Sequence, residues 1–161
     1  MAFLRSFKAR HIETCHHMTT EQICHILIKP QTALHRRSIV QQLSKTNELL
    51  DWGEHSNWFV SHAWSNLFFP MIDAILNFFD QRSDAETAVI WIDLFCISQH
   101  TNPELQVSPM WWSAFSKCIQ DARRMLLVIE SWKQPKPLQR SWYRFIFECT
   151  DWLQQPLRLI T

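Results

Sequence analysis

The chain has 161 residues and a mass of 19.3 kDa, which is the size of one domain with a core of moderate size. It contains nine tryptophans but only one glycine, Gly53, so it cannot build the glycine-rich loops that hold phosphates in Walker and Rossmann sites. With 47% hydrophobic and 19% charged residues the composition is that of a folded globular protein, and a net charge of +1 indicates no surface for nucleic acid.

The cysteines and the longest uncharged stretch bear on where the protein resides. Five cysteines, an odd number, occur without paired spacings and without a secretory signal, which favours reduced thiols in a cytoplasmic protein. Residues 55–72 carry no formal charge, but serine, asparagine, histidine and proline interrupt the stretch. An isolated membrane span would have to bury these polar groups in hydrocarbon, so we expect no membrane segment.

Residues 1–55 are predicted to form a helical N-terminal preamble. Its basic first twelve residues are interpreted as a short arm and not a mitochondrial presequence, because most targeting segments are longer. Thr19 and Gln22 have the spacing of a capping box and predict a helix that ends near Pro30. A second short helix is predicted over residues 38–43.

The rest of the chain alternates between strand and helix patterns. Short apolar runs rich in aromatic and β-branched residues predict buried strands, which fall at 57–62, 88–93, 125–130 and 157–160. Apolar residues at helical spacing predict amphipathic helices, which fall at 67–79, 110–122 and 139–153.

This alternation requires crossover connections, and therefore a parallel sheet with helices on both faces. The predicted fold class is α/β and flavodoxin-like, with three layers and a short parallel sheet of about three to five strands over residues 56–161. The end of the chain directly after Leu159 and Ile160 is consistent with truncation.

Three of the predicted strands end in polar residues: Ser61 and His62, Asp93, and Glu130 with Ser131. In open parallel sheets, ligands bind beyond the carboxyl ends of the strands, so these residues mark a candidate site. Asp93 suits a general base, an acceptor for ribose hydroxyls or a cap for the following loop. His62 suits a phosphate ligand, an acid or base near neutral pH, or a structural donor.

A group of cysteines and histidines in the preamble raises the alternative of a zinc-stabilised structural module. The group comprises Cys15, His16, His17, Cys24 and His25. Its spacing lacks the paired ligands of structural zinc sites, so zinc is kept only as a distant alternative and no metal is expected.

Two blocks of sequence resemble known families. Ser61-His62-Ala63-Trp64, together with W-I-D-L-F-C-I-S-Q-H at residues 91–100, resembles the fungal heterokaryon-incompatibility (HET) domain. The F-V-S-H-A-W form of the first block is similar to TIR-like domains of multidomain proteins in protists and algae. The resemblance covers about residues 28 to 146 and implies a flavodoxin-like fold.

The resemblance also implies a function, namely intracellular defence or cell-death signalling through self-association or contact with other signalling domains. No cofactor is required for this function. Some TIR domains cleave the nicotinamide–ribose bond of NAD with a glutamate, which makes NAD a substrate or ligand in the alternative interpretation. The residues implied in nucleotide binding are Ser61, His62, Trp64, Asp93, Phe95, Gln99, His100 and Trp142.

The chain departs from both families at the catalytic glutamate. That residue follows a tryptophan by four positions, and Trp142 fits the pattern, but position 146 is Ile146. Glu148 lies two residues later, which on an α-helix is a rotation of about 200°. Glu148 and Asp93 are therefore the candidate catalytic carboxylates of the alternative.

Overall fold

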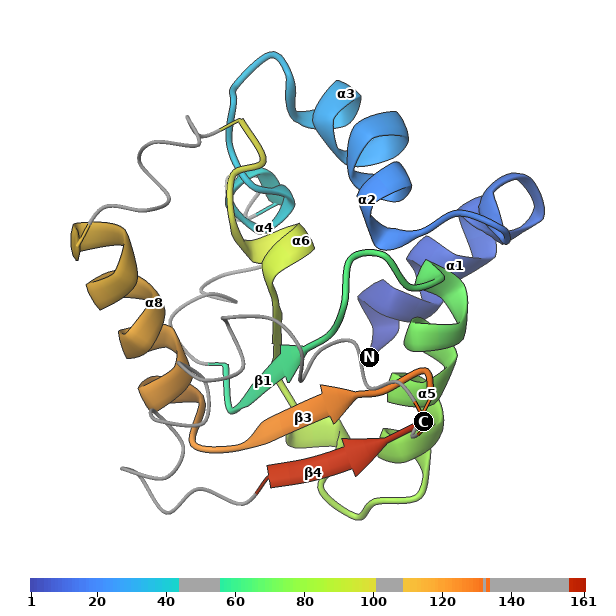
Figure 1. The fold of residues 1–161 in the computed structure, drawn as a ribbon, viewed down its shortest axis with the longest axis vertical. Coiled ribbons are helices and arrows are strands. Elements are labelled where there is room, and N and C mark those ends of the chain that lie inside the picture. Colours follow the sequence, from blue (N-terminus) through green and yellow to red (C-terminus); the bar gives the residue numbers. More distant parts are fainter. Residues whose placement is uncertain (44–55, 101–108, 132, 134–156) are drawn as a thin grey trace.

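The computed structural model describes residues 1–43, 56–100, 109–131, 133 and 157–161 (Figure 1). At its centre is a parallel sheet of four strands in the order β2-β1-β3-β4. The strands are β1 (Trp58–Ser61), β2 (Ile90–Ile92), β3 (Met125–Val128) and β4 (Leu157–Ile160). These strands confirm the predicted mixed α/β class with a parallel sheet, although each of the first three is shorter than its apolar run.

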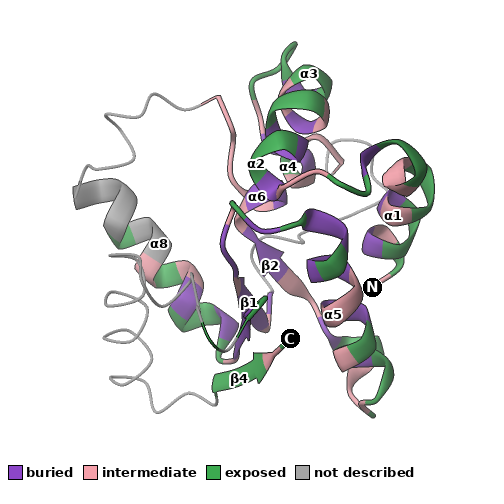
Figure 2. Cartoon of the chain, turned by 45° about the vertical axis from the view of Figure 1, so that its right-hand side comes forward, coloured by how far each residue is buried: buried purple, intermediate pink, exposed green. Residues whose placement is uncertain are grey.

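Alternate residues of the strands point to opposite faces of the sheet. Trp58, Val60 and Leu126 belong to the larger hydrophobic cluster, which also contains the apolar face of α5 (Phe68–Asp80). Phe59 and Met125 belong to a second cluster with residues of α8 (Pro109–Ala122). Figure 2 shows α5 and α8 on opposite sides of the strands, so helices cover both faces as predicted.

The N-terminal residues form a helix, α1 (Ala2–Cys15), where the sequence suggested a short arm. Leu4 and Phe7 are buried in the larger cluster, and they lie on one stripe of the helix. On the outside, Arg5 pairs with Asp80 and Lys8 with Asp73, both on α5. The basic residues that resembled a targeting segment are thus the solvent-facing side of an amphipathic helix.

The rest of the preamble contains a continuous helical run and a short helix, α4 (Ile39–Leu43). The run comprises α2 (Thr20–Ile23), the π-helical turn η1 (Cys24–Ile28) and α3 (Lys29–Thr32). Both hydrogen bonds of the predicted capping box, between Thr19 and Gln22, are present. Pro30 has no N–H to donate to the preceding turn, which explains why the wider π-helical turn precedes it.

Two arginines have backbone conformations that glycine usually adopts. Arg36 closes the turn that follows α3 with a φ of 50°, and its N–H donates to the carbonyl of Thr32 at 2.8 Å. Arg123, before β3, has a φ of 57°. The left-handed conformation costs a residue with a Cβ about 1–2 kcal/mol. The single glycine of the chain is Gly53, so both left-handed positions are occupied by arginine, and each carries this conformational cost.

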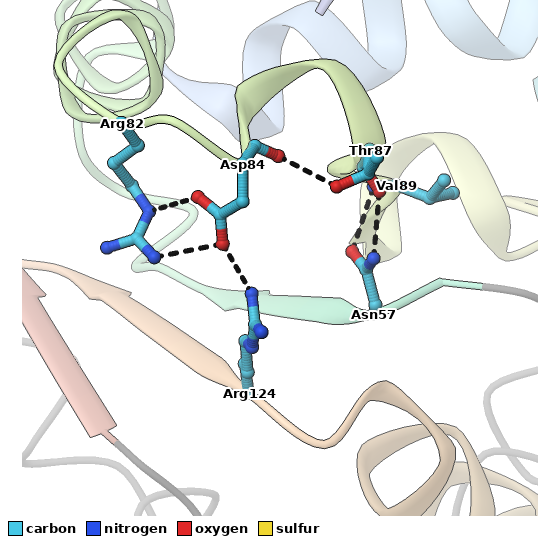
Figure 3. A network of polar contacts seen from close by, with 6 residues as sticks. All are labelled: Asn57, Arg82, Asp84, Thr87, Val89 and Arg124. Carbon is cyan, nitrogen blue, oxygen red and sulfur yellow. Dashed lines mark hydrogen bonds and ion pairs between the residues drawn. The ribbon is translucent and has the colours of Figure 1, made fainter.

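The amino-terminal edge of the sheet is held by a network of polar contacts (Figure 3). Arg82 forms two hydrogen bonds to the carboxylate of Asp84, and Arg124 forms a third at 2.6 Å. Both guanidinium groups also lie over the ring of Trp58, at 5.2 and 5.4 Å from its centre. The hydrogen bonds from Arg82, and then the one from Arg124, lower the pKa of Asp84 from 3.8 to about 2. Two guanidinium groups thus share one carboxylate at this edge.

Beside this network, the side chain of Asn57 joins β1 to the segment before β2. Its amide nitrogen donates to the carbonyl of Thr87 at 2.8 Å, and its oxygen accepts from the N–H of Val89 at 2.9 Å (Figure 3). None of the helices in the described part of the chain is long and apolar enough to cross a membrane.

Candidate functional site

The site predicted at the carboxyl ends of β1 and β2 is formed by residues of both motif blocks. Asp93 is the first residue of α6 (Asp93–Cys96) and directly follows β2, while His62 and Trp64 follow β1. The indole Nε1 of Trp64 donates to Asp93 Oδ2 at 2.7 Å, across 29 residues of sequence. Because β1 and β2 are neighbours in the sheet, the two blocks meet at one edge.

The carboxylate of Asp93 receives hydrogen bonds from two neutral donors. Besides the indole of Trp64, the backbone N–H of Leu94 donates to Oδ1 at 2.7 Å. His62 Nδ1 is 3.9 Å from the same oxygen, which is longer than a hydrogen bond. The side chain of His62 is 2% exposed and that of Asp93 is 30% exposed. Asp93 thus presents part of a carboxylate to solvent, above a buried imidazole.

Ser61, the last residue of β1, lies opposite Leu127 of β3 and is partly exposed. It therefore stands at the carboxyl end of β1, where this strand pairs with β3. The strand order changes direction here, because the chain runs from β1 to β2 on one side and then to β3 on the other. In open α/β sheets such a junction is where ligands bind.

Gln99 organises the turn that follows α6. Its side-chain nitrogen donates to the backbone carbonyls of Asp93 at 3.0 Å and Ile97 at 3.1 Å. Its oxygen is 3.8 Å from the thiol of Cys24, which lies on η1 in the preamble. The structure therefore gives Gln99 a role in holding backbone together, in place of contact with a ligand.

Phe95 lies in the hydrophobic core. It is 3% exposed and makes edge-to-face contacts with Phe3, Phe7 and Phe68, with ring centres 5.1, 5.3 and 6.2 Å away. Its ring joins α1 to α6 and α5 and is buried within the protein. A nucleotide cannot stack on Phe95 without displacing α1.

His100 is linked to the end of the helical run in the preamble. Its Nε2 is 2.8 Å from the hydroxyl of Thr32, and that hydroxyl donates its single hydrogen to the carbonyl of Ile28 at 2.7 Å. Nε2 of His100 must therefore carry the hydrogen of the contact with Thr32. Arg36 donates to the carbonyl of His100 at 2.9 Å and accepts from the hydroxyl of Ser98 at 2.8 Å.

The preamble also pairs with the loop that follows β1. The N–H groups of Thr20 and Glu21 donate to the carbonyls of Asn66 and Trp64, each at 3.1 Å, in a short antiparallel bridge. In Figure 1, α2, α3 and α4 gather around α6. The preamble thus holds both segments that carry the motif blocks. Sequence reasoning missed this role, because partners such as Thr32 and His100 have no recognisable spacing.

The remaining candidates divide between residues with other roles and residues that are not described. Trp142, Ile146 and Glu148, with the predicted helix 139–153, lie outside the described residues.

Burial raises the pKa of the Cys24 thiol and raises that of Cys96 to about 12, so neither thiol is an activated nucleophile.

The zinc alternative gains no support from the cysteines and histidines of the preamble. The described residues contain no group of three or more histidine, cysteine, aspartate or glutamate side chains placed to hold a metal ion. Cys15 is buried in the core, whereas His16 and His17 are exposed and contact each other edge to face.

No family model matches this chain, and neither does any of the curated proteins or solved structures with which it was compared.

Proposed function

We propose that this chain is a TIR/HET-like signalling domain of the cytoplasm that acts through self-association or through binding another signalling domain. The observation that carries this proposal is the 2.7 Å hydrogen bond between Trp64 and Asp93. These two residues belong to the two separate blocks through which the sequence resembles those families. Such a direct contact is expected if the two blocks, which are distant in sequence, form one structural unit in the fold.

The topology supports the flavodoxin-like part of the proposal. The order β2-β1-β3-β4 is the order of the first four strands of a flavodoxin-like sheet, which runs 2-1-3-4-5. Both the alternation of strands and helices and the resemblance had predicted this fold. The strand order is an independent argument for it, because it follows from the pairing of the strands and not from any motif.

The uses of the motif side chains favour an interaction domain over an enzyme. Phe95 is in the core, Gln99 binds backbone carbonyls, and His100 is linked to Thr32 of the preamble. These residues build the fold and the surface that it presents. A nucleotide would then bind at the ends of β1 and β2, where the exposed edge of the Asp93 carboxylate accepts hydrogen bonds from ribose hydroxyls.

The alternative function, cleavage of the nicotinamide–ribose bond of NAD, is favoured by the environment of Asp93. Its two hydrogen-bond donors are neutral, so they orient the carboxylate without cancelling its charge. A carboxylate in this state stabilises an oxocarbenium-like transition state. Glu148 is the other carboxylate to test.

The experiment compares two aspartates in the same protein. Asp93→Asn changes the carboxylate between the motif blocks, and Asp84→Asn changes a carboxylate at the opposite edge of the sheet. We expect the wild type to self-associate in concentration-dependent light scattering, Asp93→Asn to associate more weakly and Asp84→Asn to behave as the wild type. Equal association of both variants would contradict a role for the motif edge.

A parallel assay with NAD separates the two functions. The proposal predicts that no nicotinamide is released at high protein concentration. If the wild type releases nicotinamide and Asp93→Asn does not, the protein is the enzyme of the alternative. Glu148→Gln tests the other carboxylate in the same assay.

A further inference from the structure

β4 is the outermost strand on one side of the sheet, beside β3, and its other side pairs with no described strand (Figure 1). The direction of its backbone groups follows from one hydrogen bond, in which the carbonyl of Ile160 accepts from the N–H of Ile129. In a strand, the N–H and C=O of one residue point to one side and those of the next residue to the other side. Ile160 and Arg158 therefore bond toward β3, whereas the backbone groups of Leu157 and Leu159 point outward.

The side chains of β4 place an apolar strip beside this outward row of backbone groups. Leu157 and Leu159 are 36% and 45% exposed, and they share the face of the sheet that carries Met125, the residue opposite Leu157. Arg158 and Ile160 lie on the other face, where Ile160 packs against the larger hydrophobic cluster. Sheet edges are usually protected by charged residues, proline or a covering segment. The leucine face of β4 has no charged residue, and Figure 2 shows the strand mostly exposed.

A second copy of the same edge fits this row of backbone groups. Two antiparallel β4 strands are related by a twofold axis, and residues with outward backbone groups then face each other and exchange two hydrogen bonds. An axis at Arg158 places two like charges directly opposite each other, which is destabilising. An axis at Ile160 centres the pair on a side chain that the core already covers. An axis at Leu159 pairs the most exposed leucine of the strand with its copy and places Arg158 opposite Ile160, so no like charges meet.

We propose that the outer edge of β4 is a self-association surface, at which two copies of this chain join their sheets antiparallel about an axis at Leu159. The inference rests on the proposed function and gives its self-association a structure. β3 and β1 lie between β4 and β2, which leads to Asp93, so the motif edge stays open in each copy. A strand of four residues makes a small interface, so the pair forms and dissociates with concentration.

Leu159→Lys tests the surface, because it places two ammonium groups opposite each other at the axis, while a lysine suits the exposed edge of the separate chain. Leu34→Lys is the matched control, because Leu34 is 86% exposed and lies after α3, at the far end of the molecule from β4 (Figure 1). In light scattering, the concentration needed for association should rise about tenfold for Leu159→Lys and stay at the wild-type value for Leu34→Lys. Equal concentrations for the two variants would overturn the proposal. A wild type that stays at the mass of one chain would instead contradict self-association itself.

Hydrogen exchange of the wild type measures the pairing without any variant. The N–H of Leu159 points outward, so its exchange should be fast in dilute protein and about tenfold slower once the mass has doubled. The N–H groups of Arg158 and Ile160 face β3 and should exchange at the same rate at both concentrations. A doubled mass with an unchanged exchange rate at Leu159 would overturn the proposal and leave self-association in place, because the copies would then meet at another surface.

Discussion

The two ends of the central sheet each hold an aspartate near a tryptophan, and they use the pair in opposite ways. At the amino-terminal edge, Asp84 lies between two arginines that also cover Trp58. At the carboxyl-terminal edge, Asp93 is held by neutral donors, one of them the indole of Trp64. In the first arrangement two positive groups bind the carboxylate and hold the edge together. The second fixes the position of a carboxylate and leaves its charge available to a ligand or a partner.

The two edges also differ in how they are covered. The network at the amino-terminal edge involves residues that lie before β1, β2 and β3 in the chain, and so belongs to the α/β part of the protein. The carboxyl-terminal edge is held by the preamble, through the core contacts of Phe95 and the hydrogen bonds of Trp64 and His100. The geometry of the candidate site therefore depends on residues 1–43 as much as on the sheet.

Phe7→Ala should have the largest effect and tests this dependence on the preamble. Phe7 is 3% exposed and contacts Phe68 and Phe95, so its loss should lower the free energy of unfolding by about 3–5 kcal/mol. Leu34→Ala is the control, because Leu34 is 86% exposed and should change stability by no more than about 0.5 kcal/mol. Equal stability of the two variants in urea unfolding would show that α1 is a dispensable arm.

Trp64→Phe should have the next largest effect, because it removes the indole donor to Asp93 and keeps an aromatic ring. Loss of a hydrogen bond to a charged group should lower stability by about 1–3 kcal/mol. Hydrogen exchange should report faster opening in residues 62–66 and 93–97, while the strands keep their protection. If exchange in these two segments does not change, the hydrogen bond does not hold the motif blocks together.

The left-handed conformation of Arg36 predicts a smaller effect, a difference in stability between two substitutions at this position. Arg36→Ala and Arg36→Gly both remove the guanidinium that donates to His100, but only glycine relieves the backbone cost. The glycine variant should be more stable than the alanine variant by about 1 kcal/mol in thermal or urea unfolding. A glycine variant less stable than the alanine variant would argue against the left-handed conformation of Arg36.

The smallest effect, at the amino-terminal edge, should appear as a dependence on pH. The pKa of Asp84 is lowered from 3.8 to about 2 in the folded protein, so its contacts stabilise the fold at pH values above 3.8. This contribution should disappear as the pH falls through about 2. The stability difference between wild type and Asp84→Asn should therefore shrink over this interval, and a difference that is constant with pH would contradict the charged network.

The elements of the sheet were predictable because their signals are local. Short apolar runs predicted all four strands, and the capping box at Thr19 predicted the start of α2. Residues 1–55 were predicted to be helical, but the first twelve were interpreted as a short arm, whereas the structure has helix α1 there with Leu4 and Phe7 on its buried stripe.

The candidate site was predictable only in part. The polar residues at the strand ends predicted that His62 and Asp93 would be close, since parallel neighbouring strands end at one edge. The contact of Trp64 with Asp93 and the burial of Phe95 depend on loops and on packing across 29 or more residues, which no spacing encodes. The pairing of Thr32 with His100, 68 residues apart, is of the same kind.

The central claim, that this chain is a signalling domain acting by association, is tested most directly by its mass in solution. Light scattering over a wide range of protein concentration should give a mass that starts near the 19.3 kDa of one chain and rises as the protein is concentrated. A mass that stays at that of one chain at every concentration, together with release of nicotinamide from NAD, would contradict the account and favour the enzyme.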